Sequence, residues 1–470
     1  MIYLDNAATT QIDKRVLDAM MPYLTTQYGN AGTLYKFGRS AGEAVKQARA
    51  QVAEFLNAKP EQILFTSGGS EANSLVFQGL KEYLKSIGKT HILVSAIEHD
   101  SVLKAAHSLI KDEFYIEYLP AHSDGKVFAQ SVEDAITPKT GLVSVMYVNN
   151  ETGAVNPIEE IGTICMKRGI LFHTDCVQAA GCHPIDVEKI GCDFLSISSH
   201  KIHGPKGVGA LFAKEKSMLA PIIFGGAEQE FGLRGGTENV AGIVGFGMAC
   251  EISTKSLHED CIWVSTLKQR FYMALTDALK KNGCAEIVHT NGSSVLSPGK
   301  TLNLCLRGID GQTLLLMLDG KSICISAGSA CRSHEAEPSH VLIAMGLTPD
   351  EARSSIRISF SRMNTADEIV DAANIIASCI EILASGVEKR RNCMGKTILA
   401  SMSRQQKLHC IPSIRKKSAE SFSNYHMTSD ARSSMYLTRA VTMAFFPVRP
   451  TTHMSSLLLA GVLLYMILLP

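Results

Sequence analysis

The segment SSHKIHGPKG, residues 198–207, overlaps the end of the apolar run Phe194–Ser198 and gives the strongest indication of the fold. A lysine placed just after a buried strand, here Lys201, can form a Schiff base with an aldehyde. Hydroxyl and imidazole groups beside it, on Ser198 and His200, can hold a phosphate, and the glycines let the backbone approach a ligand closely. A lysine by itself is usually a solvated charge, so its interpretation depends on what the rest of the chain supplies.

The segment FHTDCVQ, residues 172–178, precedes the lysine and supplies a carboxylate, Asp175, at the end of another apolar run. A carboxylate in that position can hold the proton of a pyridinium nitrogen and so keep the ring an electron sink. The alternative role for Asp175 is that of a helix N-cap. Its spacing from Lys201 favours the first role and makes the pair a motif hypothesis for a cofactor with an aldehyde and a pyridinium ring.

Three further polar clusters follow apolar runs. TSGGSEAN, residues 66–73, places Gly69 and Ser70 at the start of a helix, where backbone N–H groups can bind an anion. AIEHDS, residues 96–101, contains His99, which can stack on a cofactor ring and exchange a proton near neutral pH. VNNETG, residues 148–153, offers the Asn150 amide. Each cluster alone also has a structural explanation, as a helix cap or a structural histidine.

The order of elements indicates an α/β fold. Apolar runs predict strands, and stretches with helical spacing lie between them up to about position 260. This pattern implies a mostly parallel sheet with helices on both faces, and ligands bind beyond the carboxyl ends of such strands. The predicted strands are 63–66, 91–96, 142–148, 170–174 and 194–198, and the predicted helices are 41–56 and 158–168.

The chain is predicted to divide into four parts. Residues 1–14 form an N-terminal arm that joins the small domain, and residues 15–260 form the large cofactor-binding domain. Residues 261–388, with predicted helices over 261–282 and 365–384, form a smaller α+β domain. Residues 389–470 are expected to be a disordered extension.

These motifs, in this order and spacing, resemble the fold-type I pyridoxal-phosphate (PLP) enzymes, and among them the NifS/IscS-type cysteine desulfurases of the class-V aminotransferases. The resemblance extends from Tyr3 to about Ala384. It implies that Lys201 is the cofactor-linked lysine, that Asp175 pairs with the pyridinium nitrogen, that Gln178 touches the phenolic oxygen and that His99 stacks on the ring. It implies further roles for other residues: phosphate binding by Gly69, Ser70, Ser198 and His200, and contact with substrate and cofactor oxygens by Asn150.

The resemblance also implies a homodimer and a substrate. In RGGTEN, residues 234–239, Thr237 matches a threonine that reaches the phosphate of the partner subunit. Arg357, in the run Ser355–Ser359, can clamp a carboxylate bidentately, although a surface salt bridge is the alternative. Asn30 matches a second carboxylate contact, but Ala31 stands where the family usually has proline.

Cys331 separates a desulfurase from other PLP enzymes. It lies in SAGSACRS, residues 326–333, among small residues that allow an exposed nucleophilic thiolate. By resemblance it accepts sulfur from L-cysteine as a persulfide, with L-alanine as the other product, and passes the sulfur to an acceptor protein. An iron–sulfur scaffold and a tRNA-thiolation protein both fit this role. We expect no resident metal, since a cluster-ligand role for Cys331 arises only during transfer.

Two alternatives stay open from the sequence. A selenocysteine lyase or an aminotransferase-like PLP enzyme would use the same cofactor site. A catalytically idle scaffold belongs to another class, and the presence of Lys201, Asp175, His99 and Cys331 argues against it.

Composition limits the location and partners of the protein. Hydrophobic residues make up 46% of the chain, charged residues make up 19%, and the net charge is +1. Direct binding of nucleic acid is therefore not expected. The 13 cysteines suggest no disulfide framework and the sequence opens without a secretory leader, which predicts a cytoplasmic location.

The C-terminal extension differs in composition from the rest of the chain. Twelve of the 46 basic residues fall between Lys389 and Arg449, so this tail is basic. Its final apolar run, Leu457–Leu469, is too short to span a bilayer, and membrane contact is not expected.

Overall fold

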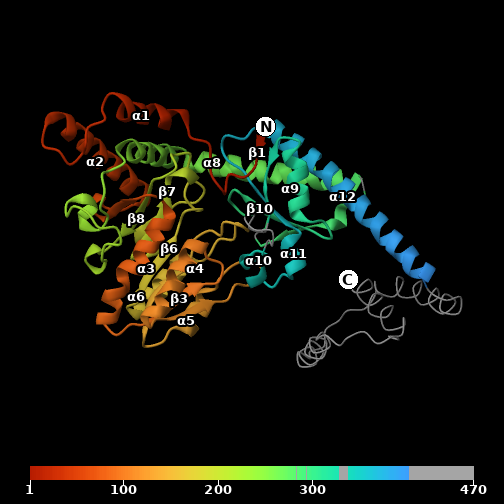
Figure 1. Ribbon diagram of the computed structural model, residues 1–470, viewed down its shortest axis with the longest axis horizontal. Helices are drawn as coiled ribbons and strands as arrows, with labels where there is room; N and C mark the ends of the chain where they lie inside the picture. The colour runs from red at the N-terminus through yellow and green to blue at the C-terminus, as the bar shows by residue number, and fades with distance from the viewer. Residues whose placement is uncertain (282, 293, 328–336, 402–470) are drawn as a thin grey trace, which may run out of the picture. The chain divides into compact units, whose positions relative to one another are not determined.

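The computed structural model describes residues 1–281, 283–292, 294–327 and 337–401, with only the backbone described for residues 387–401. Its contacts divide the chain into two compact units, Met1–Ala384 and Ser385–Pro470. Figure 1 shows the first unit, in which a large sheet with its helices adjoins a smaller group of strands and helices that includes β10 and α9.

The large sheet has seven strands in the order β2-β8-β7-β6-β5-β3-β4. Strands β3 to β7 are mutually parallel, and β8 runs antiparallel to both of its neighbours. The strands are β2 (Ile63–Thr66), β3 (His91–Ser95), β4 (Tyr115–Leu119), β5 (Thr140–Ser144), β6 (Leu171–Asp175), β7 (Phe194–Ser198) and β8 (Gly209–Ala213). This mostly parallel α/β sheet confirms the predicted fold class.

Helices cover both faces of this sheet. Alternate strand residues point to opposite sides, and apolar residues lie on both sides. Phe65 and Phe212 point to the face covered by α2 (Lys36–Leu56) and α6 (Ile158–Arg168). Leu64 and Leu211, which are paired across β2 and β8, point to the opposite face. That face is covered by α3 (Gly69–Ser86) and α4 (Asp100–His107). The sheet is therefore buried on both sides, as its nearly continuous apolar strands require.

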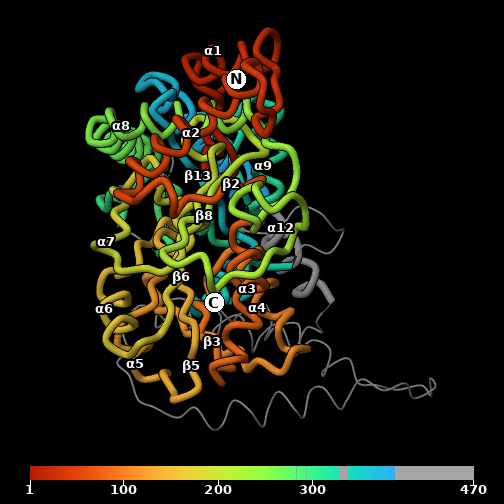
Figure 2. The backbone as a smooth tube through the Cα atoms, turned by 90° about the vertical axis from the view of Figure 1, so that its left-hand side faces the viewer, coloured from red at the N-terminus to blue at the C-terminus, as the bar shows by residue number. Residues whose placement is uncertain are grey.

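The peripheral helices of the first unit include α1 (Lys14–Thr25), α5 (Ala129–Ala135) and α7 (Val187–Ile190). In Figure 2, α5 lies beside α6 at the opposite end of this unit from α1. Helices α5 and α7 both contact α6, whereas α1 packs against α8. These helices therefore pack against α6 or α8, which themselves contribute to the core around the sheet.

Helix α8 (Val240–Lys281) is longer than the predicted helix over 261–282 and passes through residue 260, where a domain boundary was predicted. Its first half contains Gly245 and Gly247, and glycine usually weakens a helix. A Cβ atom on Gly245 would lie 2.6 Å from Sδ of Met20, and one on Gly247 would lie 2.7 Å from Cα of Ala48. The glycines therefore allow α8 to pack closely against α1 and α2.

The smaller group of elements is built on an antiparallel sheet of four strands, in the order β12-β13-β10-β9. Its strands are β9 (Val288–Asn291), β10 (Thr301–Leu306), β12 (Ser326–Ala327) and β13 (Ser355–Ser359), and its helices are α9 (Gly311–Asp319), α10 (His340–Ala344) and α11 (Pro349–Arg353). The N-terminal strand β1 (Ile2–Tyr3) pairs with β11 (Ile323–Cys324), so the start of the chain joins this part.

Helix α12 (Ala366–Ser401) extends beyond residue 388, where the tail was predicted to begin. Its segment Ala366–Gly386 is long and apolar enough to cross a membrane by composition alone. However, Ile369, Ile376 and Ile380 on this segment are fully buried in the same core as the second half of α8. The apolar composition of α12 is thus explained by packing within the first unit. The terminal run Leu457–Leu469 lies outside the described residues.

Candidate active site

A cavity of about 280 Å³ lies at the carboxyl ends of the central strands. Nine of the residues predicted from sequence line it: Gly69, Ser70, His99, Asn150, Asp175, Gln178, Ser198, His200 and Lys201. They come from distant positions in the chain, and the sheet topology brings them together as expected for an α/β fold.

Lys201 lies just after β7 and donates hydrogen bonds from Nζ to the carbonyl oxygens of Ala7 and Ala8, at 2.5 and 2.8 Å. Burial lowers the pKa of Lys201 to about 7, and the positive charges of Lys300 and Arg357 contribute to this lowering. A large part of the Lys201 population is therefore an unprotonated amine near neutral pH. Only that form can attack an aldehyde or remove a proton.

Asp175 ends β6 and is held by two donors. Its Oδ2 accepts a hydrogen bond from Nδ2 of Asn73 at 2.8 Å, and its Oδ1 accepts one from the backbone N–H of Val177 at 2.9 Å. Asn73 also donates to Oγ of Ser101 at 2.9 Å. The carboxylate is thus fixed in a buried position at the cavity wall, which suits a partner for a ring nitrogen.

Asn73 and Ser101 line the cavity but were missed from the sequence. The available signal was their spacing, because Asn73 lies one helical turn after Gly69 and Ser101 lies shortly after His99. Spacing alone does not show that Asn73 contacts Asp175, since that contact joins α3 to β6.

His99 is the N-cap of α4. Its Nδ1 accepts a hydrogen bond from the backbone N–H of Ser101 at 3.1 Å and lies 2.8 Å from Oγ of the same residue. The other ring nitrogen, Nε2, then carries the proton of the neutral imidazole. The structural role that the sequence left as an alternative therefore coexists with an exposed ring that lines the cavity.

The start of α3 lines the cavity through Gly69 and Ser70. A Cβ atom on Gly69 would lie 2.8 Å from Cγ2 of Val177, so only glycine fits where this helix meets the loop after Asp175. The first N–H groups of a helix have no partners within the helix and can bind an anion. Burial also lowers the pKa of His200 to about 4, so its ring is neutral near pH 7.

The residues fit a pyridoxal-phosphate group. Among the described residues, Oδ1 of Asn73, Oδ1 of Asn150 and Oε1 of Gln178 are buried without a hydrogen-bond partner, and all three residues line the cavity. A bound group with polar substituents would satisfy such atoms, which are unfavourable when left unpaired. Together with the Lys201 amine and the α3 N-terminus, they provide contacts for an aldehyde, a ring and a phosphate.

A larger cavity of about 730 Å³ shares His99 and Asn150 with the first. Arg357, on β13, lines this second cavity, and its Nη1 donates to the Asn150 carbonyl oxygen at 3.1 Å while its Nη2 donates to Oδ1 of Asp5 at 2.8 Å. Its Nε is buried without a partner among the described residues. The predicted carboxylate-binding guanidinium is thus adjacent to the cofactor cavity and keeps a free donor.

Two predicted site residues lie away from the cofactor cavity, and a third is not described. Cys331 lies outside the described residues. Thr237 is exposed and does not line the cofactor cavity of its own chain. Asn30 is exposed as well, and its Oδ1 accepts a hydrogen bond from the N–H of Gly32 at 2.9 Å. The structure therefore brings neither Thr237 nor Asn30 into the cavity of the same chain.

The comparisons with known proteins show the family of the chain. The family model described as aminotransferase class V matches residues 2–371. The chain belongs to this family. The family and the geometry identify the cofactor as pyridoxal 5′-phosphate.

Individual relatives of the family are similar over most of the chain. A putative cysteine desulfurase, IscS 1, of Bacillus subtilis is 43% identical over 383 residues, which cover 81% of this chain and 99% of the relative. A solved NifS-like protein has a TM-score of 0.73 at 34% identity and covers 81% of this chain and 100% of its own. The solved structure of SspA in complex with cysteine has a TM-score of 0.64 at 34% identity, with coverage of 78% and 100%. The predicted family is confirmed.

Proposed function

We propose that this protein is a cysteine desulfurase, which converts L-cysteine to L-alanine and leaves the sulfur on Cys331 as a persulfide. One observation carries the proposal beyond the family. Ala327 and Glu337, the described residues on either side of the Cys331 segment, both line the larger cavity together with His99 and Arg357. The described residues that flank this segment therefore line a cavity that shares His99 and Asn150 with the cofactor site.

Arg357, Lys201 and two other residues of the site each have a separate role in the proposed reaction. When bound, the cofactor supplies an electron sink for the carbon skeleton of the substrate. Arg357 binds the carboxylate of cysteine through its guanidinium, and Lys201, as a free amine, removes the α-proton. Asp175 keeps the ring nitrogen protonated, and Nε2 of His99 moves the proton of the substrate thiol.

The sulfur atom is transferred to the thiolate of Cys331. The Cys331 thiolate attacks the sulfur atom of the substrate, and the carbon–sulfur bond breaks with its electron pair remaining on carbon. That carbon takes up a proton, Lys201 returns to the α-carbon the proton that it removed, and the product leaves as alanine. The sulfur atom stays on Cys331 as a persulfide, from which an acceptor thiol removes it.

Other features of the proposal concern assembly and partners. Thr237 is exposed and does not line its own cavity, which supports a homodimer in which it contacts the phosphate of the partner's site. The sulfur acceptor is an iron–sulfur scaffold protein or a tRNA-thiolation protein, and the protein works in the cytoplasm.

Product analysis tests the function. Purified wild type, supplied with L-cysteine and a reductant, should release alanine and sulfide in equal amounts, and Cys331→Ser should release neither while keeping the colour of the bound cofactor. Cys324→Ser is the matched control, because Cys324 is partly exposed on the nearby strand β11, and it should behave as wild type. Sustained sulfide release by Cys331→Ser would contradict the role of Cys331. If the wild type carries the coloured cofactor and releases no product from cysteine but does react with selenocysteine, the substrate would be selenocysteine instead of cysteine.

A further inference from the structure

Lys201 lines a second, smaller cavity in addition to the cofactor cavity. This cavity has a volume of about 30 Å³, which is enough for one or two water molecules. Lys300, Asp260 and Arg362 also line it. The two lysines come from different parts of the chain, Lys201 from the turn after β7 and Lys300 from the residue before β10.

Lys300 is held in this cavity without a hydrogen-bond partner for its amine. The residue is 6% exposed, and its Nζ is buried and unpaired among the described residues. Its backbone is fixed, because its carbonyl oxygen accepts a hydrogen bond from the N–H of Phe360 at 2.9 Å. An unpaired buried amine is unfavourable, so its position needs an explanation other than local bonding.

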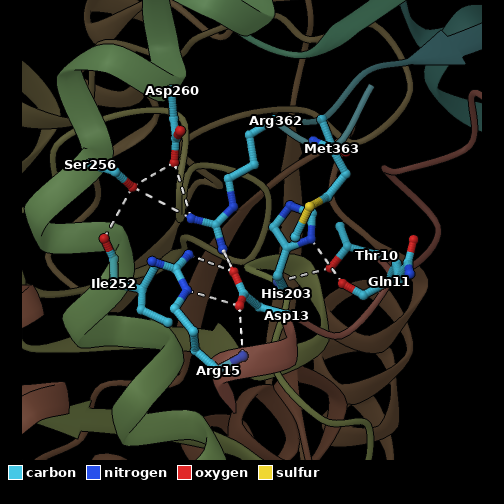
Figure 3. A network of polar contacts seen from close by, with 11 residues as sticks. Thr10, Gln11, Asp13, Arg15, His203, Ile252, Ser256, Asp260, Arg362 and Met363 are labelled. Atoms are coloured by element: carbon cyan, nitrogen blue, oxygen red, sulfur yellow. Dashed lines mark hydrogen bonds and ion pairs between the residues drawn. The ribbon is translucent and has the colours of Figure 1, made fainter. Parts of the chain in front are cut away.

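The nearby carboxylates are bound by other donors. Asp260 accepts hydrogen bonds from Oγ of Ser256 at 2.7 Å and from Nη1 of Arg362 at 3.4 Å, as Figure 3 shows. Asp5 pairs with Arg357, and Asp175 with Asn73 and Val177. Each of these acids is therefore at least partly satisfied, and Lys300 has no dedicated counter-ion within the described residues.

We propose that Lys300 is a positioning residue that sets the proton affinity of the Lys201 nitrogen across the cavity that the two side chains share. Two positive charges in one buried space repel each other strongly, so protonation of either amine opposes protonation of the other. Lys300 makes protonation of Lys201 less favourable and keeps its nitrogen available for chemistry. Cationic neighbours are a recognised means of activating lysine.

The titratable surroundings of the pair are consistent with this arrangement. Asp5, Asp175 and Arg357 act electrostatically on Lys201, and Cys182 and Arg357 act on Lys300. The lysines in turn lower the pKa values of the neighbouring histidines His183, His200 and His203. Burial is the largest cause that lowers the pKa of each lysine, and Lys300 is the largest of the charges that lower the pKa of Lys201. Removing Lys300 would leave burial nearly unchanged and remove this charge.

The inference rests on the proposed role of Lys201, and an optical titration of the holoenzyme tests it without any substrate. The absorbance of the bound cofactor is recorded against pH for wild type and Lys300→Met, a neutral residue of similar length. The titration midpoint of the Lys201–cofactor linkage should rise by about one pH unit in Lys300→Met, a tenfold change in proton affinity.

Lys268→Met is the matched control. Lys268 is 2% exposed and also buried as an amine, but its Nζ donates to the carbonyl oxygen of Ser297 at 2.6 Å and it does not line either cavity with Lys201. Its removal should leave the midpoint unchanged. If Lys300→Met does not fold, Lys300→Gln removes the same charge and should give the same upward shift.

An unchanged midpoint in a folded Lys300 variant, or an equal shift in Lys268→Met, would overturn the inference. Failure of the proposed role of Lys201 is recognised separately, because Lys201→Ala would then still show the titrating absorbance of a linked cofactor. If cysteine is not the substrate, the release of alanine and sulfide would be absent, whereas the optical titration of the cofactor would give the expected shift.

Discussion

Nη2 of Arg357 donates a hydrogen bond to Oδ1 of Asp5 at 2.8 Å, which joins the proposed substrate-binding guanidinium to the fifth residue of the chain. The side chains are 12% and 20% exposed, so the pair is largely shielded from water. Asp5 also forms an isolated β-bridge with Ser359 on β13, and this bridge fixes its backbone beside the strand that carries Arg357. The N-terminal segment therefore orients the guanidinium.

Asp5→Ala should weaken cysteine binding. Hydrogen bonds between charged groups contribute about 1.5–3 kcal/mol, so loss of this one should raise KM for cysteine about tenfold with a smaller change in kcat. Steady-state kinetics of alanine formation would measure both constants. Asp350→Ala removes an exposed pair with Arg353 and should leave KM unchanged. A fall in kcat alone would show that Asp5 acts elsewhere.

Asn73→Ala should weaken retention of the cofactor, because the Nδ2 atom of Asn73 holds Oδ2 of Asp175 at 2.8 Å. A hydrogen bond to a charged acceptor is worth about 1.5–3 kcal/mol, and the dissociation constant for pyridoxal phosphate should rise about tenfold or more. Equilibrium dialysis against apoprotein would measure it. Asn374→Ala, at an exposed position of α12, is the control. If both variants retain pyridoxal phosphate equally well, Asn73 does not contribute to cofactor binding.

The contacts of Asp13 with Arg15 and Arg362 should stabilise the fold in a pH-dependent way. Oδ2 of Asp13 accepts hydrogen bonds from Arg15 at 2.7 Å and from Arg362 at 2.6 Å (Figure 3). The hydrogen bond from Arg15 is the main cause that lowers the pKa of Asp13 from 3.8 to about 2. Because the folded pKa is depressed, the stabilisation is complete above about pH 5 and is lost as pH falls towards about 2.

Asp13→Asn should therefore lower the free energy of unfolding at pH 7 by about 2 kcal/mol and reduce its dependence on pH between about 5 and 2. Urea unfolding at several pH values would measure both effects. Asp18→Asn removes an exposed pair with Lys14 on the same helix, and such pairs contribute about 0–1 kcal/mol. Equal losses in the two variants would contradict a specific role for the contacts of Asp13 with Arg15 and Arg362.

Glu98 should be a neutral acid in the folded protein. The residue is fully buried, and its Oε1 accepts hydrogen bonds from Oγ of Ser95 at 2.8 Å and from the N–H of Met146 at 2.5 Å. Burial raises its pKa well above the ordinary value of 4.5. Because the folded pKa is raised, this carboxyl group makes the fold less stable as pH increases above the pKa of the unfolded chain.

Glu98→Gln keeps the shape of the side chain and removes its ionisation in the unfolded state. The variant should be more stable than wild type at pH 8, and the difference should disappear below about pH 4. Urea midpoints at the two pH values would measure this. Glu133→Gln, which alters an exposed pair with Arg168, should show no such gain. Lower stability of Glu98→Gln at pH 8 would indicate that the carboxyl group is ionised in the folded state.

Element boundaries show where sequence reasoning was sufficient and where it was not. Strands β2 and β7 and helix α6 occupy the predicted residues, because each has apolar periodicity bounded by polar residues or glycine. The predicted strand over 142–148 is shorter, ending at Ser144. Helix α8 begins at Val240, well before its predicted start. By sequence, Gly245 and Gly247 indicate a weak helix there. Only the structure shows that α1 and α2 pack closely against these glycines.

Local patterns in the sequence were enough to predict the α/β class, which follows from apolar runs and the polar residues at their ends, and the resemblance of the motifs to a known family added the cofactor and nine residues that line its cavity. The partners of those residues came only from the folded chain. The contacts of Asn73 with Asp175 and of Asp5 with Arg357, and the cavity that Lys300 shares with Lys201, join residues that lie far apart in the sequence. No local pattern encodes such contacts, since they depend on which elements the tertiary structure brings side by side.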